Sequence, residues 1–464
     1  MNSVEILSAG GGANLEPSLA STISSLKLEK ICEFITLTIS QETLSFINNN
    51  IDLIYSWITS LEFEVKYKNT KFPPLMKPSV IDYKQLPANI AWELNIPLPK
   101  CRFIYATGHG SGGTAMLHFL RALYDESGYF LNVSYSESLA KDRYIYHYKN
   151  LVDNADKTNA IAILDYGLSK YGSRLDRDKF FALLPRDVPL IMQVRDPISV
   201  IKHGFHKSGG VGTRVTLGLN SDFNTLSSYI SWDGYTRELV PVYDSFKIQS
   251  FIYHSLLKSI ASPCVYYVDF DDIAKENVLK TMENIANAFS LYAPTKTEHC
   301  KKIFCAKMFR GALHNLWHTY PLTLIARARD IGLDSDLEVQ LYISKPATHF
   351  GGCLDIISLF ACEFSDDICV YITEDSFGIL KSNEVLYKAT FDYVERLLSF
   401  LCDKSKEYDS QITLTIQDVL EYFRGNKGAR ENLKEILDYE LAHIKKHRED
   451  IVNNWQYYLE FDRI

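Results

Sequence analysis

Four glycines within six positions mark the part of this sequence that is best suited to bind an anion. They lie in the stretch Gly-His-Gly-Ser-Gly-Gly at positions 108–113, between the apolar run 103–106 and a segment whose apolar residues recur at helical spacing. A glycine-rich turn that opens a helix gathers backbone N–H groups where the helix dipole also favours negative charge. A structural turn in an α/β domain is the alternative. We predict a phosphate or sulfate site formed by Gly108, Gly110, Ser111, Gly112, Gly113 and Thr114.

The same stretch differs from the loop of a nucleoside triphosphatase at one position. Gly108 and Gly113 have the GxxxxG spacing of a P-loop, but Thr114 stands where a P-loop carries its lysine. Because that lysine stabilises charge on the β- and γ-phosphates, the threonine disfavours an ordinary ATPase or kinase.

A second candidate site follows the apolar run 188–194, where the tripeptide Arg-Asp-Pro begins at Arg195. An arginine offers a planar fork of donors to a phosphate, and a proline readily occupies the first position of a helix. We expect Arg195, together with Ser199 and Lys202 on the following helix, to bind the same ligand as the glycine loop. The alternative is an Arg–Asp pair that caps this helix.

Four histidines are candidates for the general base that an in-line transfer to a hydroxyl needs. His109 leads because it lies within the glycine loop and because an imidazole titrates near neutral pH. His203 and His206 follow Arg195 in the chain, and His118 is a further rival. The alternative for each of them is a structural role.

A second glycine-rich segment, 206–214, contains three glycines between basic residues. Lys207 and Arg214 are candidates to close over the donor and to supply the positive charge that the first loop lacks. A flexible surface loop is equally compatible with this composition.

Further apolar runs indicate how these residues are positioned. The runs 160–164, 188–194 and 264–268 are continuous rather than alternating, as in parallel strands that are buried on both faces. We therefore predict a three-layer α/β fold with a parallel sheet. Because ligands of such sheets bind beyond the carboxyl ends of the strands, Asp165 and Asp269 are expected at the same edge as the two candidate sites.

The chain divides into three predicted parts. Residues 1–98 form a helical segment, with two helices between 25 and 63, and a proline-rich connector. Residues 99–330 form the core that binds the donor. Residues 331–464 form an α+β region, which we expect to cover the acceptor side and which ends in one helix over 430–458.

Composition excludes some classes of partner. The 464 residues carry a formal net charge of −8, so no overall basic field attracts nucleic acid. The nine cysteines are scattered rather than paired, the first residues lack the features of a signal peptide, and no apolar run reaches the ~20 residues of a membrane helix. We predict a cytoplasmic protein without a transmembrane segment, with peripheral association with the inner membrane as the alternative.

The residues that come nearest to a metal site are Cys300, Cys305, His314 and His318. The spacer between Cys305 and His314 has eight residues, whereas that of a zinc finger has ~12. We therefore predict no metal ligand. Magnesium bound through the phosphates of a nucleotide donor is left open.

Together, the glycine loop and the strand that ends in Arg-Asp-Pro resemble the sulfotransferase family of P-loop-like proteins. A third segment, 265–273, is similar to the family's strand that ends in Y-E-D-L, and the resemblance covers residues 99–289. It implies a sulfotransferase-like fold and transfer of a sulfuryl group from the nucleotide PAPS to an alcohol or amine. It further implies that residues 110–114 hold the donor's 5′ side and that Arg195 holds its 3′-phosphate.

Two departures from that family widen the choice of donor. Gly110 or Ser111 stands in place of the basic residue that the family has before S-G-T, and His203 stands in place of a serine. The expected donor is therefore PAPS or another activated nucleotide, such as a cytidine nucleotide.

The stretch 90–99, which runs into the glycine loop, also resembles an uncharacterised bacterial family found in capsule and lipooligosaccharide gene clusters. This resemblance implies a transferase whose acceptor is a surface polysaccharide or oligosaccharide and whose transferred group is sulfuryl, a phosphoramidate-type group or a sugar. One alternative is a nucleotide-sugar glycosyltransferase, which the D-x-D spacing of Asp269 and Asp271 favours. The other is a nucleotide- or glycan-binding module without catalysis.

Overall fold

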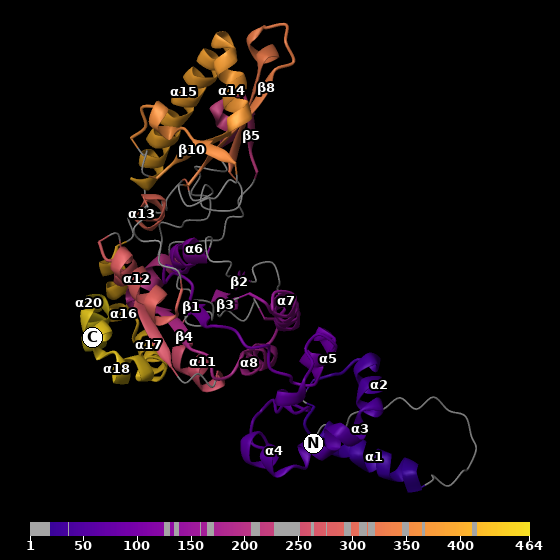
Figure 1. Ribbon diagram of the computed structural model, residues 1–464. Coiled ribbons are helices and arrows are strands. Elements are labelled where there is room, and N and C mark those ends of the chain that lie inside the picture. The colour runs from indigo at the N-terminus through magenta and orange to yellow at the C-terminus, as the bar shows by residue number, and fades with distance from the viewer. Residues whose placement is uncertain are drawn as a thin grey trace. The chain divides into compact units, whose positions relative to one another are not determined.

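In the computed structural model, the chain forms two compact units (Figure 1). The first unit contains residues 1–100, 137–153 and 171–186, and the second contains residues 101–136, 154–170 and 187–464. The residues that the structure describes are 19–35, 37–124, 130–133, 139–157, 159–164, 171–205, 214–226, 251–260, 264–274, 276–291, 298–305, 313, 321–345, 352–363, 367–410 and 415–464.

The first unit consists of short helices. Four of them, α1 to α4, replace the two helices that we predicted over 25–63, because polar caps interrupt the apolar pattern. The hydroxyls of Ser40 and Ser60 accept hydrogen bonds from the N–H groups of Thr43 and Phe63 and so begin α2 and α4. The helices are α1 (Leu19–Cys32), α2 (Gln41–Asn49), α3 (Ile51–Ile58), α4 (Leu61–Lys66), α5 (Ala88–Glu93), α7 (Ala140–Asp153) and α8 (Arg174–Ala182), with a 3-10 turn η1 (Pro78–Val80).

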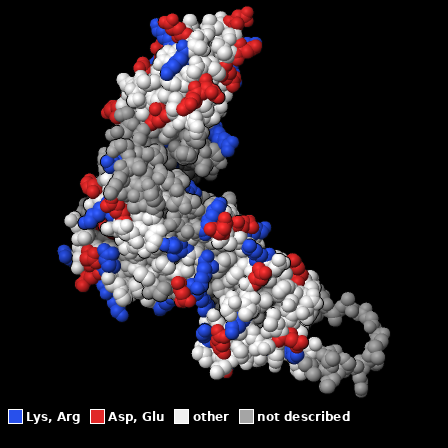
Figure 2. All heavy atoms as spheres, in the orientation of Figure 1, with Lys and Arg blue, Asp and Glu red and all other residues white. Residues whose placement is uncertain are grey.

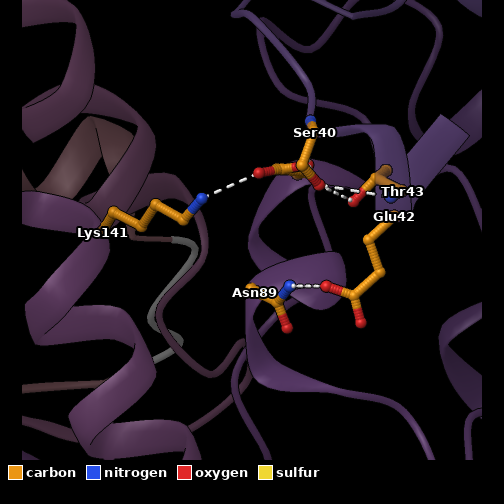
Figure 3. A network of polar contacts seen from close by, with 6 residues as sticks. Ser40, Glu42, Thr43, Asn89 and Lys141 are labelled. Atoms are coloured by element: carbon orange, nitrogen blue, oxygen red, sulfur yellow. Dashed lines mark hydrogen bonds and ion pairs between the residues drawn. The ribbon is translucent and has the colours of Figure 1, made fainter.

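A buried carboxylate joins three helices of this unit. Glu93, the last residue of α5, accepts hydrogen bonds from Ser40 N (2.8 Å), Ser40 Oγ (2.9 Å) and Lys141 Nζ (2.7 Å). In Figure 3, Lys141 of α7 and Ser40 at the start of α2 approach each other from opposite sides of this carboxylate. Burial opposes the charge of Glu93, but these hydrogen bonds hold its pKa down at about 2. Because α7 packs here, a helix of the predicted core 99–330 belongs to the N-terminal unit.

The second unit contains a five-stranded parallel sheet with the strand order β2-β3-β1-β4-β6. The predicted parallel sheet is thus confirmed, and the chain has a mixed α/β architecture. Helices α6, α12 and α13 share an apolar core with this sheet. The elements are β1 (Ile104–Thr107), α6 (Gly113–Tyr124), β2 (Phe130–Val133), β3 (Asn159–Leu164), β4 (Leu190–Val194), α9 (Pro197–Phe205), α11 (Tyr253–Ser259), β6 (Val265–Asp269), η5 (Phe270–Ile273), α12 (Val278–Ala288) and α13 (Glu298–Cys305).

A second five-stranded sheet, with the order β5-β7-β8-β10-β9, lies in the same unit. Strand β5 pairs with β7 in parallel, and the other pairs are antiparallel. Buried and less buried residues alternate along β7 and β8, as in a sheet with one covered face. The elements are β5 (Thr216–Gly218), η3 (Phe223–Leu226), β7 (Leu322–Arg327), η7 (Ala328–Ile331), β8 (Glu338–Ser344), β9 (Cys353–Asp355), η8 (Ile357–Leu359), β10 (Cys369–Thr373), α14 (Glu374–Ser382) and α15 (Glu384–Asp409).

The chain ends in a series of five helices rather than in the single helix predicted over 430–458. The backbone leaves helical geometry at Arg448 (φ −144°, ψ 54°) and at Trp455 (φ −83°, ψ 80°), so one apolar stripe is divided among several short helices. They are α16 (Ile416–Gly425), α17 (Lys427–Glu440), α18 (Ala442–His447), α19 (Glu449–Asn454) and α20 (Gln456–Arg463).

Two surface properties bear on partners. Among the described residues, no helix combines the length and the apolar character that a membrane span requires. On the face drawn in Figure 2, Lys and Arg side chains are interspersed with Asp and Glu side chains. The full sequence carries a formal net charge of −8.

Candidate functional site

The strand order creates a switch point between β1 and β4. Within this sheet, the strand that follows β1 in the chain is β2, on one side, whereas the strand that follows its neighbour β4 is β6, on the other side; β5, which lies between β4 and β6 in the chain, belongs to the second sheet. The order in which the chain adds strands to this sheet therefore reverses direction between β1 and β4. In open α/β sheets such a point forms the crevice in which ligands bind. Both predicted sites, the glycine loop after β1 and Arg195 after β4, lie at this point.

The glycine loop is held so closely that two of its positions require glycine. Gly112 has a φ of +87°, and a Cβ there would lie 2.8 Å from Cδ2 of Phe270. A Cβ on Gly113 would lie 2.5 Å from Cγ2 of Thr107. Side chains at these positions would force the loop away from the strand ends. The glycines therefore allow α6 to begin soon after β1 ends.

The first turn of α6 presents backbone donors. Met116 N donates to Gly112 O (3.2 Å), which closes the first helical hydrogen bond. Within the described part of the chain, the N–H groups of Gly113, Thr114 and Ala115 have no hydrogen-bond partner. These donors, at the positive end of the helix dipole, form a cradle for an anion, which we call the α6 cradle.

Arg195 brings a guanidinium group to this loop. Its Nη1 donates to Gly110 O at 2.8 Å, and its Cζ lies 3.9 Å from the centroid of the Phe270 ring. Phe270 therefore contacts the arginine and also limits the space at Gly112. The structure thus joins two segments that are 85 residues apart, and the ring of a third segment fixes the plane of the guanidinium.

A buried glutamine ties the loop to the sheet. Gln193 Nε2 donates to Ser111 O at 2.7 Å, and the hydroxyl of Tyr105 donates to Gln193 Oε1. Both side chains are fully buried. Sequence reasoning missed this role, although Gln193 is the one polar residue in the apolar run 188–194. A polar residue inside a buried strand needs a partner, and here that partner is the backbone of the glycine loop.

Two hydroxyls beside the loop lack satisfactory partners. Ser111 Oγ and the hydroxyl of Tyr253 at the start of α11 are both buried, and neither makes a hydrogen bond of acceptable geometry. The two groups are close enough to influence each other, and burial raises the pKa of Tyr253. Because a buried polar group without a partner costs free energy, this part of the loop retains unused hydrogen-bonding capacity.

The carboxylates at the strand ends serve the protein's own framework. Asp196 Oδ1 accepts from Ile198 N (2.9 Å), and its Oδ2 accepts from Tyr457 N and Tyr458 N (both 3.1 Å), so that it caps both α9 and α20. Asp269 Oδ1 accepts from Trp455 Nε1 (3.1 Å). Burial is the largest influence on Asp269 and raises its pKa to about 7.

The remaining predicted site residues that the structure describes lie in the glycine loop, on α6 and α9, and just before β5. His109 is half-buried within the loop, and Thr114 is exposed in the first turn of α6. Ser199 and Lys202 are half-buried on α9, whose backbone also includes His203, and Arg214 is exposed just before β5 of the second sheet. The side chain of His203 and all of His206, Lys207, Asp165, His314 and His318 lie outside the described residues. Among the residues that are described, no three His, Cys, Asp or Glu side chains are grouped as metal ligands.

Comparison with protein families gives a match to the C-terminal part of the chain. A family model described as "Protein of unknown function (DUF2972)" matches residues 267–464. The match begins within β6 and includes Phe270, but it leaves out the glycine loop and Arg195. No curated protein and no solved structure matches the chain.

Proposed function

We propose that this protein is a transferase that moves a charged group, sulfuryl or of a phosphoramidate type, from a nucleotide-activated donor to a hydroxyl of a bacterial surface glycan. We also propose that residues 99–289 form a sulfotransferase-like core. The donor is PAPS or a cytidine nucleotide. This proposal unites the sequence resemblances with the position of the glycine loop at the switch point of the parallel sheet.

One observation carries the proposal. The N–H groups of Gly113, Thr114 and Ala115 have no partner within the described part of the chain, and the guanidinium of Arg195 contacts the same loop. Backbone donors and a planar cation at the same glycine loop suit the oxygens of a phosphate or sulfate group. They would also stabilise negative charge that develops on the transferred group.

The acceptor hydroxyl would lose its proton to His109 in this proposal. His109 lies between β1 and α6 and is half-buried, which puts it in the loop that we propose holds the transferred group. In the balanced reaction, the acceptor oxygen forms a bond to sulfur or phosphorus, the bond to the nucleotide oxygen breaks, and the acceptor's proton passes to the imidazole.

Thermal-shift measurements of the full chain with PAP, CMP, CDP, UDP and GDP test the donor class. A ligand that binds only the folded state raises the melting temperature. We expect PAP or CMP to do so, and we expect Arg195→Ala to abolish the shift. The control, Arg396→Ala, removes an exposed arginine on α15 and should leave the shift unchanged.

Two outcomes of this screen would overturn the proposal. Stabilisation by UDP alone would favour a nucleotide-sugar glycosyltransferase. If no nucleotide stabilises the chain, a donor-binding role for the glycine loop is wrong.

A further inference from the structure

A buried lysine of the second sheet contacts the helix that the glycine loop opens. Lys345 directly follows β8, is 4% exposed, and places its Nζ 2.7 Å from Nε2 of His118 on α6. Burial, with the nearby cations, lowers the pKa of His118 to about 3. This low pKa favours the neutral imidazole, which shares a hydrogen bond with the lysine.

Basic groups continue along the same face of α6. Residues three or four positions apart on a helix are neighbours, so Thr114, His118 and Arg121 form one stripe. At 1.5 Å per residue, His118 and Arg121 lie roughly 6 Å and 10 Å along the helix axis from Thr114 in the α6 cradle. Because helical side chains lean toward the N-terminus, these groups lean toward the cradle.

Nearby cations contribute to the low pKa values of His118 and Lys345. Burial is the largest cause of the low pKa of His118, and the other causes are the positive charges of Lys345 and Arg121. Burial and the charge of Arg121 together lower the pKa of Lys345 to about 7. Bringing basic groups together in a partly desolvated place costs free energy, and an anion bound among them would offset this cost.

We propose that His118, Arg121 and Lys345 form a second anion subsite, distinct from the α6 cradle, which binds a carboxylate of an acidic acceptor sugar. The identity of the bound molecule as an acceptor rests on the proposed function, whereas the anion chemistry rests on these three side chains. A second phosphate of the donor offers the same chemistry, and the experiment below separates these two sources. The subsite would also give the second sheet a role in binding, because Lys345 directly follows its strand β8.

Isothermal titration calorimetry of the full chain at pH 6.5 tests this subsite. Glucuronate and glucose differ by one carboxylate and probe the acceptor, while PAP and AMP differ by one phosphate and probe the donor. We expect glucuronate, but not glucose, to bind. Arg121→Gln and Lys345→Met should each weaken this binding about tenfold, since each removes a charged partner of a carboxylate. Arg121 is exposed, so its variant should fold normally.

The matched control is Lys381→Met, which removes a lysine on α14 that lies over the ring of Phe377. It should leave the affinity for glucuronate unchanged. If the two test variants instead reduce the difference in affinity between PAP and AMP, the subsite is supported. Its anion is then a phosphate of the donor rather than a carboxylate of the acceptor. Affinities that are equal in wild type and in both test variants, or the absence of any binding by glucuronate and PAP, would overturn the subsite.

The proposed function can fail without the subsite failing. If nucleotides do not bind but glucuronate binding depends on Arg121 and Lys345, the donor assignment is wrong while the subsite stands. If nucleotides bind at the α6 cradle but neither test variant changes any affinity, the subsite is wrong while the donor assignment stands.

Proton uptake provides a second readout for Lys345. The titratable and charged groups that face it among the described residues are His118 and Arg121 of α6 and Tyr371 of β10, whose hydroxyl donates to Lys345 O. A bound anion favours the protonated amine. Binding near pH 7.5 should therefore take up a proton, which appears as a dependence of the measured heat on the ionisation enthalpy of the buffer, and affinity should fall as pH rises from 6 to 8.5. Binding that is independent of pH and buffer would contradict a role for this lysine.

Discussion

Two polar clusters, one in each unit, differ in how completely their groups are paired. In the first unit, the carboxylate of Glu93 accepts hydrogen bonds from Ser40 and Lys141. At the glycine loop of the second unit, three helix N–H groups and the hydroxyl of Ser111 have no partner in the described part of the chain. The first cluster uses its hydrogen-bonding capacity to join helices, whereas the second keeps part of its capacity unused.

The two clusters differ in what they contribute: the first stabilises the fold, whereas the second is suited to binding. A paired buried carboxylate joins helices and stabilises the fold, so its removal should be felt in the free energy of unfolding. Donors without partners contribute little to folding but suit a ligand that arrives later. Two sets of substitutions test this distinction.

The largest effect on stability is expected from Glu93→Gln. Because the folded-state pKa of Glu93, about 2, lies below its ordinary value, its contribution is fully present above about pH 4.5 and is lost as pH falls toward 2. At pH 7 the variant should lose on the order of 2 kcal/mol in urea unfolding, and the difference should shrink below pH 4. Glu42→Gln alters a nearby exposed carboxylate that accepts from Asn89, and should change stability by less than about 0.5 kcal/mol. An equal loss in both variants would mean that burial and pairing do not distinguish the two carboxylates.

A smaller effect is expected from two serines. Ser40→Ala removes an N-cap and a hydrogen bond to Glu93, and should cost about 1–2 kcal/mol. Ser111→Ala removes a buried hydroxyl that makes no hydrogen bond, so stability should stay the same or rise slightly while the affinity for the stabilising nucleotide falls. Urea unfolding and calorimetry on the same preparations measure both quantities. A loss of more than about 1 kcal/mol in Ser111→Ala would show that this hydroxyl already has a partner.

The sequence predicted the parallel sheet because its strands are continuous apolar runs, which are typical of strands that are buried on both faces. The sequence predicted helix boundaries and the grouping of helices less well, because tertiary packing determines them. The helices after Leu441 and Arg448 share one apolar stripe, so periodicity alone could not locate the breaks between them. The grouping of α7 with the N-terminal helices arises from contacts between distant parts of the sequence, such as the one between Lys141 and Glu93, which lie 48 residues apart.

For the candidate site, the spacing of the glycines predicted a turn and a helix start, and both are present. The contact between Arg195 and Gly110 could be anticipated only from the rule that places ligands beyond strand ends. Gln193, Phe270 and Tyr253 were missed because their roles arise from neighbours distant in sequence. Asp269 was predicted at the right edge of the sheet, but its carboxylate accepts from Trp455, a partner that no local pattern indicates.

A crystal structure of the full chain with PAP or CMP, whichever raises the melting temperature, tests the central claim most directly. We expect oxygens of a phosphate group within hydrogen-bonding distance of the N–H groups of Gly113, Thr114 and Ala115, with the guanidinium of Arg195 against the same group. A nucleotide bound elsewhere, with these N–H groups still without partners, would contradict the account.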